Sequence, residues 1–173
     1  MTPEVVAWLV AAMSAWVPPG GNDAIRYDAI ARDILSVAFD AEEAPLYDEP
    51  NGRARTALVL ASFAAAESGG FLVDVDTGKR RGANGAVCMM QVKVGAQGTS
   101  EGWTAKDLVE NRSRCVRVGL HMMRDSVQSC RAMKGADRLS FYTHGRCVEG
   151  NGVARWRVGR ADGWLKKNPM PTP

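Results

Sequence analysis

A nearly continuous apolar run at residues 57–66, ALVLASFAAA, constrains the fold of this chain more than any other feature. The surrounding stretch 53–68 contains no Pro or Gly, and Asn51 can cap a helix start. Apolar side chains cover all sides of the predicted helix, which is typical of a helix buried in a core. Gly69 and Gly70 can then adopt the left-handed conformation that ends a helix. We therefore expect a buried helix that stops at these glycines.

Glu67 lies in the last turn of this predicted helix and is the first acidic residue after Arg53. Burial disfavours the charged form of a carboxyl group, and so does the negative end of the helix dipole. Both effects are expected to raise the pKa of Glu67. A carboxyl group that keeps its proton near neutral pH can act as a general acid. The alternative is a Glu side chain that simply reaches water beyond the glycines.

Two segments after the helix favour the catalytic interpretation. Residues 85–92 have the sequence GAVCMMQV, and residues 141–145 have the sequence FYTHG. Together with Glu67 and Ser68 they resemble the signature of the lytic transglycosylases of the goose-lysozyme-like group, over roughly residues 53–145. The matching positions after the helix are Gly85, Ala86, Met90, Gln91, Val92, Val116, Gly119, Phe141, Tyr142 and Gly145. Met89 replaces the usual Leu, and Cys88, Cys115 and Thr143 replace the usual Gly, Asn and Asn.

The resemblance implies a lysozyme-like fold of the α+β class, predominantly α, with a buried catalytic helix. It implies cleavage of peptidoglycan glycan strands between N-acetylmuramic acid and N-acetylglucosamine, without a cofactor. Glu67 would first donate a proton to the glycosidic oxygen. It would then act as a base while the 6-hydroxyl of the muramic sugar closes a 1,6-anhydro ring. Ser68, Met90, Gln91 and Tyr142 match positions that line or support the cleft, where Tyr142 can hydrogen-bond Glu67. Met90 fits a plain core position equally well.

The loop at residues 71–84 carries the remaining charged candidates. Val and Asp alternate at residues 73–76, which predicts a short strand in a small β-hairpin or irregular loop. Asp74 or Asp76, both expected to be exposed, is the candidate second carboxylate if the protein is a muramidase that hydrolyses the same bond. The basic trio at residues 79–81 either contacts the wall polymer or belongs to an ordinary solvated loop.

A third interpretation belongs to another class of protein, a non-catalytic glycan-binding component of a phage tail or envelope machine. Cys88 and Cys115 alter two signature positions and favour this interpretation. The retention of Glu67 argues against it.

The four cysteines, Cys88, Cys115, Cys130 and Cys147, are expected to form two disulfide bonds. No close Cys pair of the kind found in zinc sites is present, so no metal is expected. Cys115 and Cys130 lie about 22 Å apart along one predicted helix and cannot bond each other. Cys130 and Cys147 flank a short predicted helix and are natural neighbours, which leaves Cys88 with Cys115. The resemblance agrees, because Cys88 and Cys115 match positions that flank one cleft.

The composition of the 173 residues fits one soluble globular domain. The hydrophobic share of 46% and the charged share of 24% are ordinary, and a net charge of +3 is too small to indicate nucleic acid. Residues 1–50 are expected to form helices on the back of the buried helix, with Asn22 or Asp23 as the second cap. Residues 51–147 would form the family core, and residues 148–173 a C-terminal segment with a loose tail.

The apolar stretch at residues 5–17 is expected to be a core helix. No Lys or Arg precedes it, as a leader would require, and it is too short to span a membrane. Disulfide bonds indicate an oxidising place of work, whereas the lack of a leader indicates no ordinary export. A phage tail, which assembles in the cytosol and later meets the outside, is the expected setting. A bacterial periplasm or cell envelope is the alternative.

Overall fold

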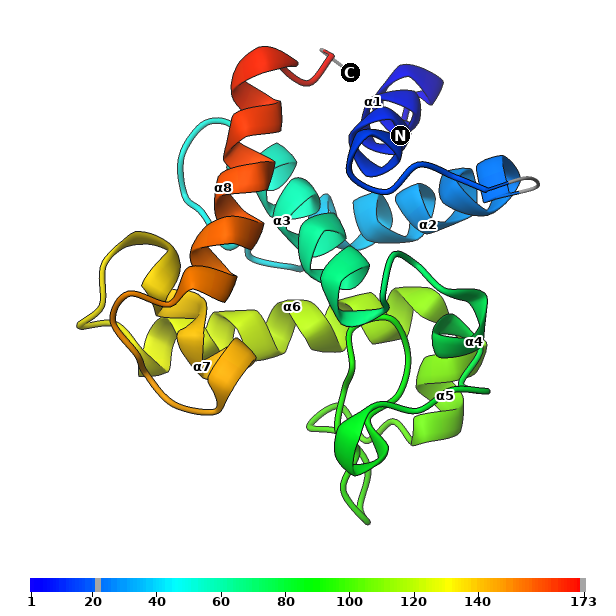
Figure 1. The fold of residues 1–173 in the computed structure, drawn as a ribbon, viewed down its shortest axis with the longest axis vertical. Coiled ribbons are helices and arrows are strands. Elements are labelled where there is room, and N and C mark those ends of the chain that lie inside the picture. The colour runs from blue at the N-terminus through cyan, green and yellow to red at the C-terminus, as the bar shows by residue number, and fades with distance from the viewer. Residues whose placement is uncertain (21–22, 172–173) are drawn as a thin grey trace.

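The computed structural model describes residues 1–20 and 23–171. These residues form eight α-helices and two short 3₁₀ helices, η1 and η2, with two isolated β-bridges and no longer strand (Figure 1). The helices are α1 (Pro3–Trp16), α2 (Asp23–Ala38), α3 (Gly52–Glu67), α4 (Val73–Asp76), η1 (Ala83–Gly85), α5 (Ala105–Glu110), α6 (Arg112–Ser129), η2 (Gly135–Leu139), α7 (Ser140–His144) and α8 (Gly152–Lys167). The expectation of a predominantly helical protein is confirmed.

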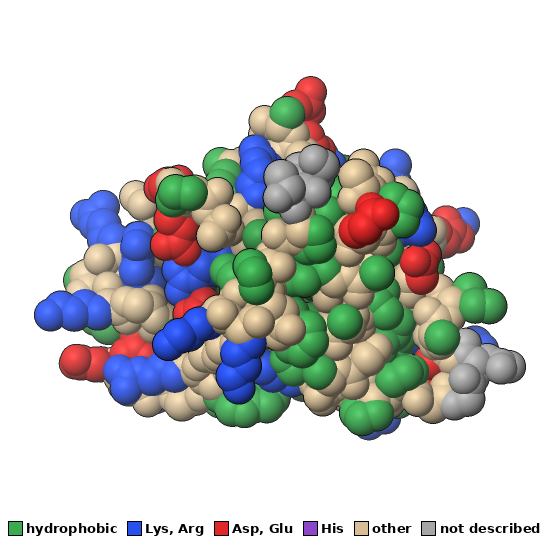
Figure 2. Space-filling model, turned by 90° about the horizontal axis from the view of Figure 1, so that it is seen from above, with side chains coloured by type: hydrophobic (Ala, Val, Ile, Leu, Met, Phe, Trp, Pro, Cys, Tyr) green, Lys and Arg blue, Asp and Glu red, His purple; other side chains and the backbone are tan. Residues whose placement is uncertain are grey.

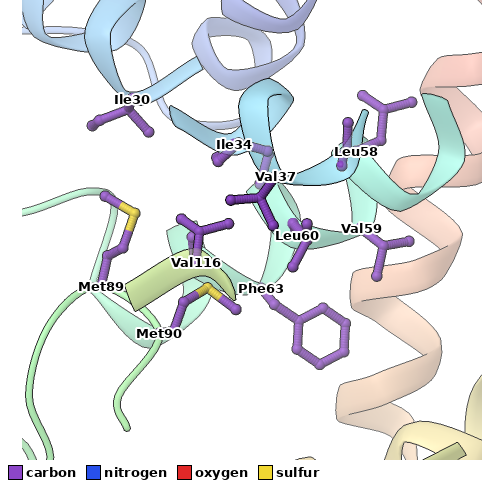
Figure 3. Close-up of a cluster of buried hydrophobic side chains, with 14 of the residues drawn as sticks. Ile30, Ile34, Val37, Leu58, Val59, Leu60, Phe63, Met89, Met90 and Val116 are labelled. Carbon is purple, nitrogen blue, oxygen red and sulfur yellow. The ribbon is translucent and has the colours of Figure 1, made fainter. Parts of the chain in front are cut away.

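The central helix is α3, which is contacted by α1, α2, α6 and α8. Figure 1 shows it between α8 and the α1–α2 pair, with α6 crossing its lower end. Every residue from Thr56 to Ala65 is buried, as the apolar pattern predicts. Figure 3 shows the core around it, with labelled side chains from α2, α3, α6 and the segment after η1: Ile30, Ile34, Val37, Leu58, Val59, Leu60, Phe63, Met89, Met90 and Val116.

The glycines end α3 in the predicted way. Gly69 and Gly70 have φ angles of 66° and 91°, in the left-handed region that a side chain disfavours. The Gly70 N–H donates a hydrogen bond to the carbonyl of Ala65 at 2.7 Å, the bond of a Schellman cap. The chain therefore turns away directly after Glu67.

The C-terminal helix α8 is fixed to α3 by polar contacts as well as by packing. The Arg55 guanidinium binds the Asp162 carboxylate through two hydrogen bonds of 2.7 and 2.8 Å. The Ser62 hydroxyl donates to the carbonyl of Arg157 at 2.8 Å, and Arg160 donates to Ser62. These contacts hold one face of α8 against α3, from its first turn at Arg55 to Ser62 in the half that carries Glu67.

The N-terminal helices cover α3: α1 and α2 pack against each other, and both contact α3. The apolar stretch in α1 is a core helix, with Val5, Leu9 and Met13 fully buried. Asp23 is the first residue of α2, and the cap predicted at Asn22 lies outside the described residues, as do the last two residues of the expected loose tail. Within the described ranges, no helix is both long and apolar enough to cross a membrane.

The short strand predicted at residues 73–76 is wrong, because these residues form the single-turn helix α4. Val75 and Asp76 are buried, whereas Val73 and Asp74 are exposed, so neighbouring residues share a face instead of alternating. The expected exposure of Asp76 is wrong as well. Its carboxylate accepts hydrogen bonds from Arg26 of α2 at 3.2 Å and Arg112 of α6 at 2.8 Å. Long-range ion pairs thus override an alternation of four residues, which is too short to decide between strand and helix.

Asn111 separates α5 from α6. It has an extended backbone with φ of −133°, and its side chain caps α6.

Asp137 of η2 joins this short helix to the start of α8. Its carboxylate accepts two hydrogen bonds from the Arg155 guanidinium, at 2.9 and 2.7 Å, and one from the Gly150 N–H at 2.8 Å. These bonds, led by those from Arg155, hold the pKa of Asp137 below its ordinary value. They also fix the start of α8 beside η2.

Viewed from above, the surface charge is unevenly distributed. Figure 2 shows Lys and Arg side chains gathered toward one side of this face and apolar side chains toward the other. The small net charge of +3 therefore coexists with local concentrations of positive charge. Local groups of Lys and Arg side chains can therefore bind anions although the net charge of the protein is small.

Candidate active site

Glu67 lies where α3 leaves the core. The helix is buried through Ala65, whereas the Glu67 side chain keeps 24% of its surface exposed. A groove of about 620 Å³ is bordered by this side chain, and so is a second hollow of about 400 Å³. Glu67, Ala83 and Gln91 border both. The carboxyl group is therefore placed between two neighbouring hollows.

The walls of the larger groove come from segments far apart in the sequence. α6 supplies Met122 and Asp125, and the segment from Phe141 to Gly145 supplies the α7 side. The remaining wall residues after α3 are Ala83, Ala86, Gln91 and Lys93. Apolar and aromatic walls with a few convergent polar groups are typical of a ligand-binding groove.

Arg157 of α8 is the ionic partner of Glu67. Its Nη1 donates a hydrogen bond of 2.5 Å to Glu67 Oε1, and its guanidinium lies 4.9 Å from the centre of the Phe63 ring. The Arg157 side chain is only 11% exposed. Glu67 Oε2 accepts no hydrogen bond within the described part of the chain. One carboxylate oxygen is therefore held, and the other is available to a ligand.

Sequence reasoning missed Arg157, although a signal was present. Ala154, Val158 and Ala161 form the buried face of α8, and Arg157 lies between two of them at helical spacing. A charged residue on the apolar face of a helix requires a partner of opposite charge. The pattern does not identify the partner, which lies 90 positions earlier in the chain.

Gln91, predicted to bind substrate, borders both hollows. It lies in a tight turn closed by the Val87–Val92 bridge, where Gln91 has φ of 51° and its side-chain amide donates to the carbonyl of Cys88 at 3.1 Å. Gly82 packs against this side chain so closely that an added Cβ would come within 1.6 Å of Gln91 Oε1. The glycine and the turn together fix the Gln91 amide beside Glu67.

Tyr142 also borders the groove, but its hydroxyl does not bind Glu67. The hydroxyl donates to the carbonyl of Met90 at 2.8 Å, and the ring packs edge-on against Phe63 at 5.5 Å. Burial, and to a lesser extent the charge of Glu67, raises the pKa of the Tyr142 hydroxyl, which keeps it neutral. The expected hydrogen bond from Tyr142 to Glu67 is absent from the described contacts, so Tyr142 supports the turn that carries Gln91.

The other two predicted substrate contacts, Ser68 and Met90, are each 1% exposed. The Ser68 hydroxyl donates to the carbonyl of Ala64 at 2.6 Å and accepts from the Phe71 N–H at 2.8 Å, so its bonding capacity is used in shaping the end of α3. Met90 packs against Gly119, where an added Cβ would come within 2.5 Å of the Met90 side chain. Met90 borders neither hollow and supports them from inside the protein, whereas Ser68, although almost fully buried, also borders the smaller hollow.

The carboxylates proposed as partners of Glu67 do not reach the groove. Asp76 is held in its buried ion pairs, and Asp74 borders neither hollow next to Glu67. Asp125 of α6 does border the larger groove, is exposed, and forms no ion pair with the described residues. Its sequence neighbourhood gave no signal for this position.

The two predicted disulfide bonds are confirmed. Cys88 bonds Cys115, and Cys130 bonds Cys147. Cys88 has φ of 58°, a conformation that glycine adopts without cost and other residues do not. The bond to Cys115 joins this residue, and the tight turn that it begins, to α6.

No group of three or more His, Cys, Asp or Glu side chains within the described ranges is arranged to hold a metal ion. Comparisons of the chain with protein-family models, curated proteins and solved structures find no match.

Proposed function

We propose that this protein is a lysozyme-like peptidoglycan lytic transglycosylase that cleaves the bond between N-acetylmuramic acid and N-acetylglucosamine. The observation that supports the proposal best is the position of Glu67. Its carboxyl group ends a buried helix, lies between two hollows and is adjacent to Gln91. A glycan strand laid across both hollows has a glycosidic oxygen near this carboxyl group.

In the proposed reaction Glu67 Oε2 donates a proton to the glycosidic oxygen as the bond from that oxygen to C1 breaks. The 6-hydroxyl oxygen of the muramic sugar then bonds to C1, and its proton returns to Glu67. The products are a 1,6-anhydro sugar and a new free hydroxyl group, so no water and no second carboxylate are consumed. Arg157 holds Oε1 throughout and orients the reacting oxygen.

A muramidase of the same fold is the second candidate, and Asp125 is the observation that favours it. Hydrolysis by two carboxyl groups requires a second acid in the same groove. Asp125 borders the groove that Glu67 borders, whereas Asp74 does not. In this version Asp125 activates the attacking water, and the product has a reducing end.

A glycan-binding component without catalytic activity is favoured by one observation, the ion pair between Glu67 and Arg157. An acid that is permanently held by a guanidinium would serve to shape the groove. Binding to wall glycan without release of soluble fragments is the expected behaviour of such a protein.

The decisive experiment is digestion of purified peptidoglycan followed by mass spectrometry of the fragments, with Glu67→Gln and Asp125→Asn beside the parent. Anhydro ends that disappear in Glu67→Gln and persist in Asp125→Asn support the transglycosylase. Reducing ends that disappear in both variants support the muramidase. If Glu67→Gln releases fragments as fast as the parent, both enzyme proposals fail.

The proposed setting is a phage tail or the bacterial envelope, with glycan strands and the proteins of that assembly as partners. The two disulfide bonds support a place of work outside the reducing cytosol.

A further inference from the structure

The smaller hollow beside Glu67 has a cationic rim. It extends from the end of α3 to a loop that carries Arg80 and Arg81, and both side chains border it. Both arginines are exposed, and neither side chain forms an ion pair or hydrogen bond with the described residues. Two guanidinium groups are therefore free to bind an anion next to the candidate acid.

Nearby acids do not neutralise this rim. Asp76 is held by Arg26 and Arg112, and Glu67 is held by Arg157. Asp74 contacts Arg80 only through the main chain, where the Arg80 N–H donates to the Asp74 carbonyl at 2.7 Å. The positive charge of the rim is thus not balanced from within the fold.

The loop that carries the arginines is anchored beside the acid. The Arg80 bond to Asp74 fixes one end, and the Gly82 N–H donates to the carbonyl of Ala86 at 2.9 Å at the other. Gly82 also lies against the Gln91 side chain. The two guanidinium groups are consequently held at a defined edge of the hollow, within the reach of a ligand that contacts Glu67.

We infer that this hollow binds a carboxylate-bearing substituent of the substrate, at the sugar adjacent to the bond that Glu67 cleaves. The inference rests on the proposed function. In peptidoglycan the muramic sugar carries a lactyl group, to which the peptide stem with its free carboxylates is attached. Guanidinium groups bind carboxylates through paired hydrogen bonds, which suits Arg80 and Arg81 to this ligand. A glycan built only from N-acetylglucosamine offers them no partner.

Binding measurements in a Glu67→Gln background test the inference, because this background prevents cleavage. The ligands are glycan fragments with peptide stems, stem-free fragments with a free lactyl carboxylate, and chitooligosaccharides, which carry no carboxylate. The Arg80→Ala/Arg81→Ala variant is compared with the control variant Arg131→Ala. Arg131 is exposed, borders neither hollow and forms no ion pair with the described residues. The double variant should bind carboxylate-bearing fragments about tenfold more weakly, and chitooligosaccharides unchanged.

Further arms separate the outcomes. Arg80→Lys/Arg81→Lys should recover part of the affinity, and added salt should reduce the preference for carboxylate-bearing fragments in the parent. A loss restricted to stem-bearing fragments identifies the stem carboxylates, because the lactyl carboxyl group of these fragments is bonded to the stem as an amide. A loss restricted to stem-free fragments identifies the free lactyl carboxylate, and a loss with both ligands shows that the hollow accepts either carboxylate. An equal loss for all three ligands, or no loss, overturns the inference. If wall digestion still depends on Glu67 in that case, the proposed function stands without it; no binding and no digestion overturn both.

Discussion

Replacing the Cys88–Cys115 bond by two alanines should destabilise the protein strongly. The bonded residues are 27 positions apart, for which the chain-entropy relation gives about 3.5 kcal/mol. The second bond, Cys130–Cys147, closes a separation of 17 positions, for which the same relation gives about 3.1 kcal/mol. The Cys130→Ala/Cys147→Ala variant is therefore a control of nearly equal stability loss.

The two variants should differ in activity. Cys88–Cys115 ties the turn of Gln91 to α6, and the neighbouring Met90 carbonyl receives the hydrogen bond of Tyr142. The second bond joins the end of α6 to the segment after α7, and α7 keeps a separate anchor because the Tyr142 N–H donates to Ser126 at 3.1 Å. Loss of the first bond should thus lower kcat/KM at least about tenfold by misplacing the groove wall, whereas loss of the second should leave it within about twofold.

A third variant isolates the backbone conformation at position 88. At φ of 58°, the Cβ of alanine raises the free energy of the folded protein by about 1–2 kcal/mol relative to glycine. Glycine is more flexible in the unfolded chain, which offsets this difference by up to about 1 kcal/mol. Cys88→Gly/Cys115→Ala should therefore be more stable than the double alanine variant by about 1 kcal/mol.

Urea unfolding gives the stabilities, and wall digestion gives the activities at a temperature where every variant is folded. The reasoning is refuted if the folded Cys88→Ala/Cys115→Ala variant digests wall as fast as the Cys130→Ala/Cys147→Ala variant. It is also refuted if loss of Cys88–Cys115 costs less than about 1 kcal/mol.

Two further predictions concern charged pairs. Arg157→Met keeps the contact with Phe63 but releases the Glu67 carboxylate, so kcat should fall about tenfold while KM changes little. Arg157→Lys should recover part of the lost kcat. An unchanged kcat in Arg157→Met contradicts a positioning role for Arg157. Because the pKa of Asp137 is lower in the folded than in the unfolded protein, its stabilising effect is complete above the ordinary carboxyl pKa and is lost as pH falls below about 4. Asp137→Asn should remove this part of the loss of stability at low pH. Urea unfolding between pH 3 and 6 gives the free energy of unfolding of variant and parent. If this free energy falls with pH equally in both proteins, the prediction is contradicted.

Local patterns were sufficient to predict the frame of the site. The burial of α3 follows from an apolar run without a polar side, and its end follows from two adjacent glycines. Helix geometry excluded a bond between Cys115 and Cys130, which lie near opposite ends of α6, and the short helix between Cys130 and Cys147 then favoured the pairing that is found. Each of these inferences needed only residues close in sequence or the rise of one helix.

Contacts between distant segments were not predictable in the same way. Asp76 adopts its place in α4 because two arginines from α2 and α6 converge on it, and a four-residue alternation carries no information about them. Arg157 lies outside the segment that resembles a known signature, yet it supplies the nearest charge to Glu67. Such pairs depend on how whole helices pack, which no short pattern encodes.

The pair between Glu67 and Arg157 is better explained by the groove than by stability. Ion pairs at partly buried positions often stabilise a fold no more than apolar side chains of similar size would. Here Arg157 Nε is buried without a hydrogen bond among the described residues, which adds a further cost. An apolar pair at the contact between α3 and α8 would avoid both costs, but it would remove the carboxylate from between the two hollows. The pair leaves one oxygen of Glu67 held by Arg157 and the other without a hydrogen bond among the described residues, so this second oxygen can contact a ligand in either hollow.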